Sequence, residues 1–169
     1  MSTLAPVVIA VEGVSDRSVL ELLARRRGRD LSAEGIEIVP IGGAHAIARF
    51  VADLPQGTTV RGLCDENEAR LFRRVLDEVW VCVPDIEGEL IRALGVEAVL
   101  AVLAGSGGLS SFRTFELQPA QRGRPIEAQL HRWLRSSSRR FHRYLALFVE
   151  ALDLEQVPSP LAAVLDVSA

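Results

Sequence analysis

The sequence contains no lysine, because all 19 of its basic residues are arginine. A Walker A loop, GxxxxGK[ST], needs a lysine to reach the phosphates of a nucleotide, so the chain has no P-loop ATPase motif. Arginine keeps its proton in proteins and binds phosphate as a planar fork. Any reaction step that needs a lysine to lose a proton is therefore excluded here.

Cysteines, aromatic residues and long apolar runs are also scarce. Cys64 and Cys82 are the two cysteines, and each lies in an apolar, strand-like run, which predicts buried free thiols in a reducing compartment. Aromatic residues make up 5% of the chain, too few for a surface that stacks bases. The longest apolar run, around Val96–Ala104, is too short to span a membrane. The N-terminus lacks the basic segment of a signal peptide, so we expect a cytoplasmic protein.

The composition is that of one folded domain, since 49% of the 169 residues are hydrophobic and 24% are charged. The charges are unevenly placed. Residues 61–111 hold five arginines against nine acidic residues, whereas residues 112–150 hold eight arginines against three. On charge alone, two solvated helical faces of opposite sign are the simpler interpretation. A metal centre beside a phosphate-binding surface is the alternative.

The first half of the chain alternates between strand and helix patterns. Apolar runs predict strands at Val7–Val11, Ile36–Ile41, Thr58–Cys64 and Val79–Val83. Apolar residues three and four apart predict helices after Ser15, at Ala44–Leu54, at Glu66–Leu76 and from Leu90. This alternation indicates an α/β fold, with a Rossmann-like, mainly parallel four-stranded sheet flanked by helices.

The second half of the chain is predicted to form a helical C-terminal extension. Helical patterns cover Ile126–Arg135 and Arg139–Leu152, while Gly105–Gly108 predicts a flexible hinge or loop. The pattern from Pro158 onward is weak. We therefore divide the chain into a core at residues 1–104 and an Arg-rich helical extension at residues 105–169, packed on the same domain.

Acidic residues follow three of the predicted strands. Glu12 follows the first strand, Asp65 the third, and Asp85 and Glu87 the fourth, while Asp16 stands at the start of the first helix. Since the carboxyl ends of parallel strands open on one edge of a sheet, these carboxylates should meet there. They would repel one another unless a cation offset their charge.

Oxygen ligands of this kind suit Mg²⁺ or Mn²⁺. Zinc is not favoured, because the sequence has no CxxC pair and its three histidines are scattered. A structural alternative exists for some of the acids, because Asp16, Glu66 and Glu89 are placed where carboxylates commonly complement a helix dipole. His45, His131 and His142 are expected on polar surfaces and not in catalysis.

Four segments together resemble a known family. They are Val8–Asp16 (VIAVEGVSD), Ile38–Gly43 (IVPIGG), Gly62–Asn67 (GLCDEN) and Val83–Ile91 (VPDIEGELI). Their order and their acidic strand ends are similar to the Toprim domain, and most similar to the Toprim region of OLD-family (overcoming lysogenization defect) nucleases. The resemblance is strong over about Val7–Leu94 and weaker over Phe112–Leu152.

The resemblance implies a nuclease that cuts phosphodiester bonds with two divalent metal ions, Mg²⁺ or Mn²⁺. It assigns the metal ligands to Glu12, Asp16, Asp65, Asn67, Asp85 and Glu87. Glu12 and Asp65 would also be catalytic, together with Arg139 or Arg140 on a basic helix at Ser138–Ala146.

Three features depart from the family pattern. The second acid of the family's Asp-x-Asp pair is Asn67, with Glu68 next to it as a possible substitute. Arginine replaces the expected lysine of the basic helix and cannot shuttle a proton. The ATPase domain that OLD proteins carry before this region is not in the sequence, which indicates a stand-alone module or one that works with a separate ATPase subunit.

The sequence as a whole thus predicts a metal-dependent endonuclease that acts on DNA. Backbone contacts without sequence selectivity are expected from seven arginines: Arg122, Arg124, Arg132, Arg135, Arg139, Arg140 and Arg143. One alternative is a degenerate Toprim module that binds metal or nucleic acid without cutting, and another is a subunit that needs an ATPase partner. Primase-type nucleotidyl transfer is disfavoured, because no zinc ribbon or nucleotide-selecting element accompanies the motifs.

Overall fold

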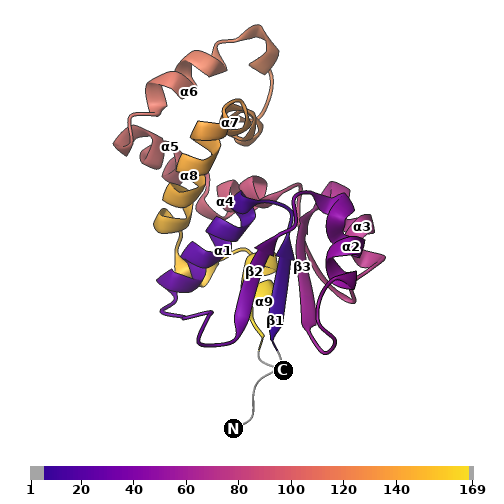
Figure 1. The fold of residues 1–169 in the computed structure, drawn as a ribbon. Coiled ribbons are helices and arrows are strands. Elements are labelled where there is room, and N and C mark those ends of the chain that lie inside the picture. Colours follow the sequence, from indigo (N-terminus) through magenta and orange to yellow (C-terminus); the bar gives the residue numbers. More distant parts are fainter. Residues whose placement is uncertain (1–5, 168–169) are drawn as a thin grey trace.

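The computed structural model describes residues 6–167 and contains one parallel sheet of four strands (Figure 1). The strands are β1 (Val7–Val11), β2 (Ile36–Pro40), β3 (Thr59–Asp65) and β4 (Glu78–Cys82), in the spatial order β2-β1-β3-β4. All pairs are parallel, and helices cover both faces of the sheet. The predicted α/β fold class is confirmed.

The strand register aligns the carboxyl ends of the strands. Val11 at the end of β1 pairs with Pro40 of β2 and with Leu63 of β3, and Asp65 at the end of β3 pairs with Cys82 of β4. The residues that follow β1, β3 and β4 therefore leave the sheet at the same edge.

Two layers of helices enclose the sheet, because successive strand residues point to opposite faces. The larger layer contains α1 (Val14–Arg26), α4 (Ile86–Leu94), α8 (Ser138–Ala151) and α9 (Ser159–Leu165). The smaller layer contains α2 (Ile47–Ala52) and α3 (Ala69–Arg73). Cys64 packs in the smaller layer and Cys82 in the larger one. Both are buried free thiols, as predicted.

Three helices, α5 (Val96–Gly105), α6 (Leu109–Glu116) and α7 (Ile126–Arg135), form an end of the molecule beyond the sheet (Figure 1). Trp133 is 1% exposed there, and its ring centroid lies 5.7 Å from that of Phe112 and 5.2 Å from that of Tyr144. Gly108 passes so close to these rings that a Cβ atom would lie 1.9 Å from the Tyr144 hydroxyl. The expected hinge is thus a tightly packed connection at this glycine.

Four short 3₁₀ turns complete the described residues: η1 (Ala44–Ala46), η2 (Glu66–Glu68), η3 (Pro119–Gln121) and η4 (Leu154–Gln156). The helices predicted at Ala44–Leu54 and Glu66–Leu76 each begin with one of these turns. Within residues 6–167, no helix combines the length and the apolar character needed to cross a membrane.

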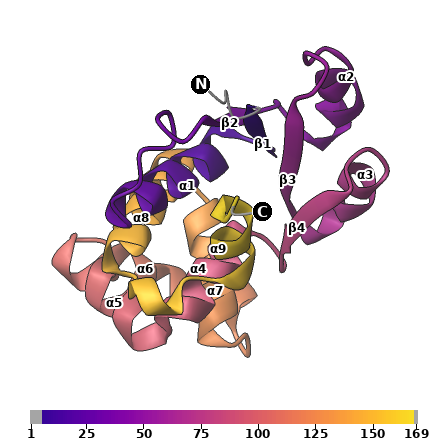
Figure 2. The same ribbon diagram turned by 90° about the horizontal axis from the view of Figure 1, so that it is seen from below.

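Two helices differ from the sequence-based expectation. α4 begins at Ile86 and not at Leu90, because the Asp85 side chain accepts a hydrogen bond from the Gly88 N–H and caps the helix. The weakly patterned segment after Pro158 forms α9, which packs against β3, β4 and α1 (Figure 2). Leu161, Val164 and Leu165 are each 0% exposed. This helix depends on burial against the sheet, which a local pattern does not reveal.

Candidate metal centre

Glu12 connects the ends of three strands. Its Oε1 accepts a hydrogen bond of 2.9 Å from the Asp65 N–H at the end of β3. Its main-chain oxygen accepts hydrogen bonds from the Gly42 and Gly43 N–H groups after β2, each at 3.1 Å. Both glycines have positive φ angles, 77° and 110°, which only glycine adopts readily. The Gly-Gly turn therefore fixes the start of the loop that carries Glu12.

Asp16 stands in the first turn of α1, and its Oδ2 accepts a hydrogen bond of 2.9 Å from the Gly13 N–H. Part of its role is thus that of a helix-start residue. Burial raises the pKa of Asp16 to about 6, and the charges of Glu12 and Asp85 contribute to the increase. Asp16 therefore stabilises the start of α1, and its carboxyl group also interacts with the charges of the other acids.

Asp65, at the end of β3, has a strongly raised pKa. Burial is the main cause, and the charges of the other acids add to it, so that the pKa of Asp65 is raised to about 8; these acids are Glu12, Asp85, Asp16 and Glu87. The charges of five of the six residues predicted to hold metal, which follow β1, β3 and β4, therefore interact at one edge of the sheet. The pKa of Glu12 is also raised, by burial and by the nearby charge of Glu68.

The sixth predicted ligand, Asn67, lies in η2 and is exposed. Its neighbour Glu68 is half-buried and close enough to Glu12 for its charge to raise the pKa of that residue. Glu68 therefore adds a carboxylate on the Glu12 side of the centre.

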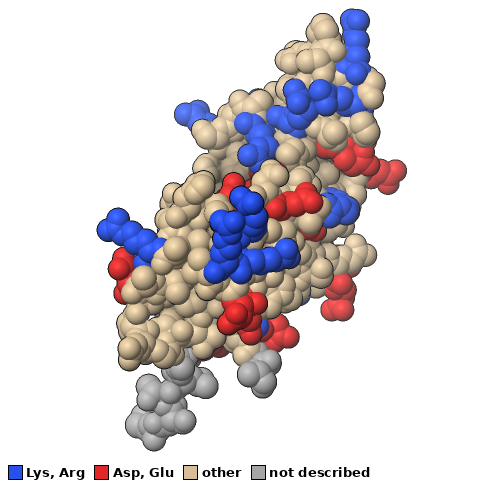
Figure 3. Space-filling view, turned by 90° about the vertical axis from the view of Figure 1, so that its right-hand side faces the viewer, with Lys and Arg blue, Asp and Glu red and all other residues tan. Residues whose placement is uncertain are grey.

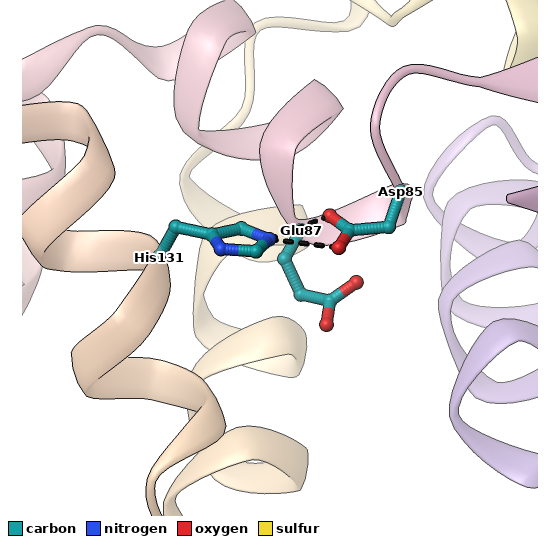
Figure 4. Close-up of side chains that lie close together, drawn as sticks. All are labelled: Asp85, Glu87 and His131. Atoms are coloured by element: carbon teal, nitrogen blue, oxygen red, sulfur yellow. Dashed lines mark hydrogen bonds and ion pairs between the residues drawn. The ribbon is translucent and has the colours of Figure 1, made fainter. Parts of the chain in front are cut away.

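Asp85 and Glu87 form the second half of the centre, and both are buried (Figure 4). The Nε2 atom of His131, on α7, lies 2.9 Å from Asp85 Oδ1 and 2.8 Å from Asp85 Oδ2. Arg135 Nη1 donates to Asp85 Oδ2 at 2.9 Å and to Glu87 Oε1 at 3.0 Å. One turn of α7 thus supplies both partners of these two carboxylates.

The pKa values of the two carboxyl groups are shifted in opposite directions. Burial raises the pKa of Asp85, but hydrogen bonds from His131 and Gly88 and the charges of His131 and Arg135 outweigh it and hold the pKa below its usual value. Burial, followed by the charge of Asp85, raises the pKa of Glu87. The hydrogen bond to Asp85 raises the pKa of His131.

Asp85, Glu87 and His131 lie close enough together to hold one metal ion. Each of the three residues offers one ligand atom, and these three atoms lie within 4.8 Å of one another. Carboxylate oxygens suit Mg²⁺ and Mn²⁺, and an imidazole nitrogen adds preference for a transition metal such as Mn²⁺. The donor set therefore fits a divalent cation.

The sequence-based expectation for His131, a polar helix face without a part in the site, does not describe its contact with Asp85. A signal for its position does exist, because His131 and Arg135 are four residues apart and share one face of α7. What the sequence does not reveal is that this face packs against α4. His45 and His142 are exposed, as expected.

Several of the predicted phosphate-binding arginines have contacts within the chain. Arg140 lies over the Trp133 ring, with its Cζ atom 4.3 Å from the ring centroid, and donates to the Trp133 carbonyl at 2.8 Å. Arg143 donates to the Ser106 carbonyl at 2.8 Å. Arg135 donates hydrogen bonds to Asp85 and Glu87. These three side chains tie helices together, whatever else they bind.

The remaining arginines of this set, Arg122, Arg124, Arg132 and Arg139, are exposed. Figure 3 shows Arg side chains gathered over the end of the molecule formed by α5–α7, with acidic and Arg side chains mixed below them. This end adjoins the metal centre, because α7 carries both His131 and Arg135.

The parallel sheet has the order β2-β1-β3-β4, and acidic residues follow β1, β3 and β4 at one edge, as the Toprim-like motifs predict. The family model described as "Overcoming lysogenization defect protein-like, TOPRIM domain" matches residues 4–56. This match falls on the segment that begins with the first of the Toprim-like motifs, and it agrees with the resemblance that the motifs predict.

Solved structures share this fold over almost the whole chain. The C-terminal region of the Burkholderia pseudomallei OLD protein aligns with a TM-score of 0.65 and 14% identity, covering 96% of each chain. The C-terminal region of the Xanthomonas campestris pv. campestris OLD protein aligns with a TM-score of 0.62 and 17% identity, covering 95% of this chain and 92% of that one. No curated protein sequence matches the chain.

Proposed function

We propose that the chain is a divalent-metal-dependent nuclease that cleaves phosphodiester bonds in DNA. The observation that carries the proposal is the convergence of Glu12, Asp16, Asp65, Asp85 and Glu87 on one edge of the sheet. Their mutual repulsion costs folding free energy unless a cation neutralises it. The match of residues 4–56 to the OLD-like Toprim family model supports the same activity.

The two halves of the centre suit two ions of Mg²⁺ or Mn²⁺. Glu12, Asp16 and Asp65 would hold one ion, and Asp85, Glu87 and His131 the other. Divalent ions in such sites lower the pKa of bound water and stabilise the attacking and leaving oxygens of a phosphoryl displacement. Mn²⁺ suits the second half best, because His131 adds a nitrogen ligand.

The chain's own side chains orient the centre. The Asp65 N–H holds Glu12 in place, and the Gly88 N–H holds Asp85 at the start of α4. The Arg135 guanidinium would offset part of the negative charge of Asp85 and Glu87 before a metal binds. Since Arg135 is 51% exposed, it can turn toward a phosphate when a metal takes its place.

The exposed arginines of the α5–α7 end would contact the DNA backbone. Arg122, Arg124, Arg132 and Arg139 are the candidates, and such contacts position nucleic acid without reading its sequence. Their placement beside the acids would bring a phosphate to the metal centre.

The direct test is nicking of supercoiled plasmid by the purified chain with Mg²⁺ or Mn²⁺. The Glu12→Gln variant keeps the side-chain shape but removes a charge, and should reduce nicking by at least about a hundredfold. Glu37→Gln, at an exposed position on β2, is the matched control and should nick like the native chain. Nicking that persists in Glu12→Gln would contradict the proposal.

A second candidate is a Toprim module that binds metal or nucleic acid without cutting, alone or until a separate ATPase subunit joins it. The exposed position of Asn67 favours it, because this residue supplies no charge to the centre. Calorimetric titration with Mn²⁺ shows whether the chain binds metal, and plasmid nicking separates the two candidates. Metal binding without nicking would support the second and exclude cleavage by the chain alone.

A further inference from the structure

A cavity of about 500 Å³ lies between α4 and α7, next to the metal centre. Its volume falls within the usual range of ligand pockets, about 300–1,000 Å³. Pro84, Ile91 and Val96 supply an apolar part of the lining, and Arg92, Arg124 and Arg132 supply a cationic part. Ile91 is buried whereas the three arginines are exposed, so the guanidinium groups stand on the solvent side.

The cavity and the metal centre share a residue. His131 lines the cavity, and its Nε2 atom is 2.8 Å from Asp85 Oδ2. One imidazole ring therefore separates a molecule in the cavity from the carboxylates that would hold metal. A nucleotide next to a phosphate at the centre is within reach of this space.

The charge of the lining favours an anion. Three arginines face one glutamate, Glu127. Arg92 is held by Glu89, at 3.1 Å, and Arg124 donates to the Ala120 carbonyl at 2.9 Å. Within residues 6–167, the Arg132 guanidinium has no hydrogen-bond or ion-pair partner, so it is available to a phosphate.

We propose that this cavity holds one unpaired nucleotide of the nucleic-acid substrate. The base would lie against the apolar lining, and its phosphate would bind Arg132 and Arg124. Guanidinium groups also stack on aromatic faces, which suits a base at the mouth of the cavity. A paired base is stacked inside its duplex and cannot enter. The proposal rests on the proposed nuclease function, and it names the substrate class as DNA with an unpaired stretch beside the cut.

The test compares two DNA probes by fluorescence anisotropy in EDTA, where no metal supports cleavage. One probe is a blunt hairpin, and the other is the same hairpin with a short unpaired tail. The native chain should bind the tailed probe at least about fivefold more tightly, since a base buried against the apolar lining and a phosphate bound by Arg132 both add to the affinity.

Two variants change the cavity in different ways. Arg132→Gln removes a charge at its mouth, and Ala128→Phe fills it without a change of charge; both should abolish the preference for the tailed probe. Arg49→Gln and Ala104→Phe are the matched controls at exposed positions on α2 and α5, and both should keep it. Because Arg132 is exposed, its variant should fold even if Ala128→Phe does not.

Equal binding of the two probes by the native chain would overturn the proposal, as would no binding of either probe. An unchanged preference in both Arg132→Gln and a folded Ala128→Phe would overturn it as well. Plasmid nicking tests the proposed function separately. Nicking without a preference for the tailed probe would overturn the cavity proposal but not the proposed function. A preference for the tailed probe without nicking would overturn the proposed cleavage but not the cavity proposal.

Discussion

His131 Nε2 lies 2.8 Å from Asp85 Oδ2, although 46 positions separate the two residues in the sequence. The contact joins α7, in the helical end of the molecule, to the loop that follows β4. It gives an otherwise acidic centre a nitrogen donor. Four predictions follow from this contact and from the surroundings of Arg135, Asp65 and Gly108.

Replacing His131 should remove a metal ligand. In the Mn²⁺-loaded chain, pulsed electron paramagnetic resonance should detect modulation from a coordinated imidazole nitrogen. His131→Gln should lose this signal and bind Mn²⁺ at least about tenfold more weakly. His142→Gln, at an exposed position on α8, should keep both. A native spectrum without nitrogen modulation would exclude His131 as a ligand.

Replacing Arg135 should destabilise the metal-free chain and strengthen metal binding. The side chains of Asp85 and Glu87 are only 8% and 3% exposed, so Arg135→Gln leaves the buried Glu87 without its cation and leaves Asp85 with His131 alone. The melting temperature in EDTA should fall by roughly 4–8 °C, and saturating Mn²⁺ should restore it.

Arg113→Gln is the control for this change. Arg113 is also 51% exposed and bonds to Glu116 at 2.7 Å, but its partner is 20% exposed and far less buried. Its replacement should change the melting temperature little, since surface ion pairs contribute about 0–1 kcal/mol. Equal effects of the two substitutions would show that Arg135 makes an ordinary surface ion pair.

The metal-free chain should lose stability as the pH rises from about 4 to about 8. The folded-state pKa of Asp65 is raised to about 8 and that of Asp16 to about 6, both above their ordinary values. A folded state that holds protons more tightly than the unfolded state is stabilised at low pH, and this stabilisation is lost as the pH passes through the raised pKa values. Urea unfolding in EDTA across this range measures the trend.

Asp65→Asn isolates the contribution of Asp65 to this trend. The variant should be more stable than the native chain at pH 9, and the difference should shrink toward pH 5, where the native carboxyl holds its proton. Asp77→Asn, at an exposed position, should show no such dependence. A difference between Asp65→Asn and the native chain that does not vary with pH would contradict the raised pKa of Asp65.

Gly108→Ala should destabilise the helical end of the molecule. A Cβ atom at this position would lie 1.9 Å from the Tyr144 hydroxyl and 2.7 Å from the ring carbon that bears it, so the rings must move. The free energy of unfolding should fall by about 1–3 kcal/mol. Gly105→Ala, in the last turn of α5, meets nothing within 4 Å and should be neutral or slightly stabilising. Urea denaturation of both variants tests the pair.

The sequence was most informative where a local pattern determines the structure. The apolar run at Val7–Val11 and the acid that follows it predicted both a strand and the position of Glu12 at the sheet edge. The spacing of apolar residues gave α7 its bounds, Ile126–Arg135. In these cases side-chain periodicity and the geometry of parallel strands are enough.

Contacts between distant segments were not accessible in this way. The face of α7 that carries His131 and Arg135 meets Asp85 only because α7 packs against α4. The exposure of Asn67 and the packing of Gly108 under Tyr144 also depend on how helices meet. Such contacts are set by three-dimensional packing, which no single stretch of sequence encodes.

The position of α9 limits how far the motif-bearing half of the chain can be regarded as a module. Arg61 on β3 donates to the carbonyls of Val164 and Asp166, so the strand that ends in Asp65 is bonded to residues a hundred positions later. α9 also covers one face of this strand and of β4. A gene fragment that encoded only residues 7–94 would carry every Toprim-like motif and yet lack the cover of its own sheet. Recombination that moves this domain between proteins must therefore carry the helical segment with it.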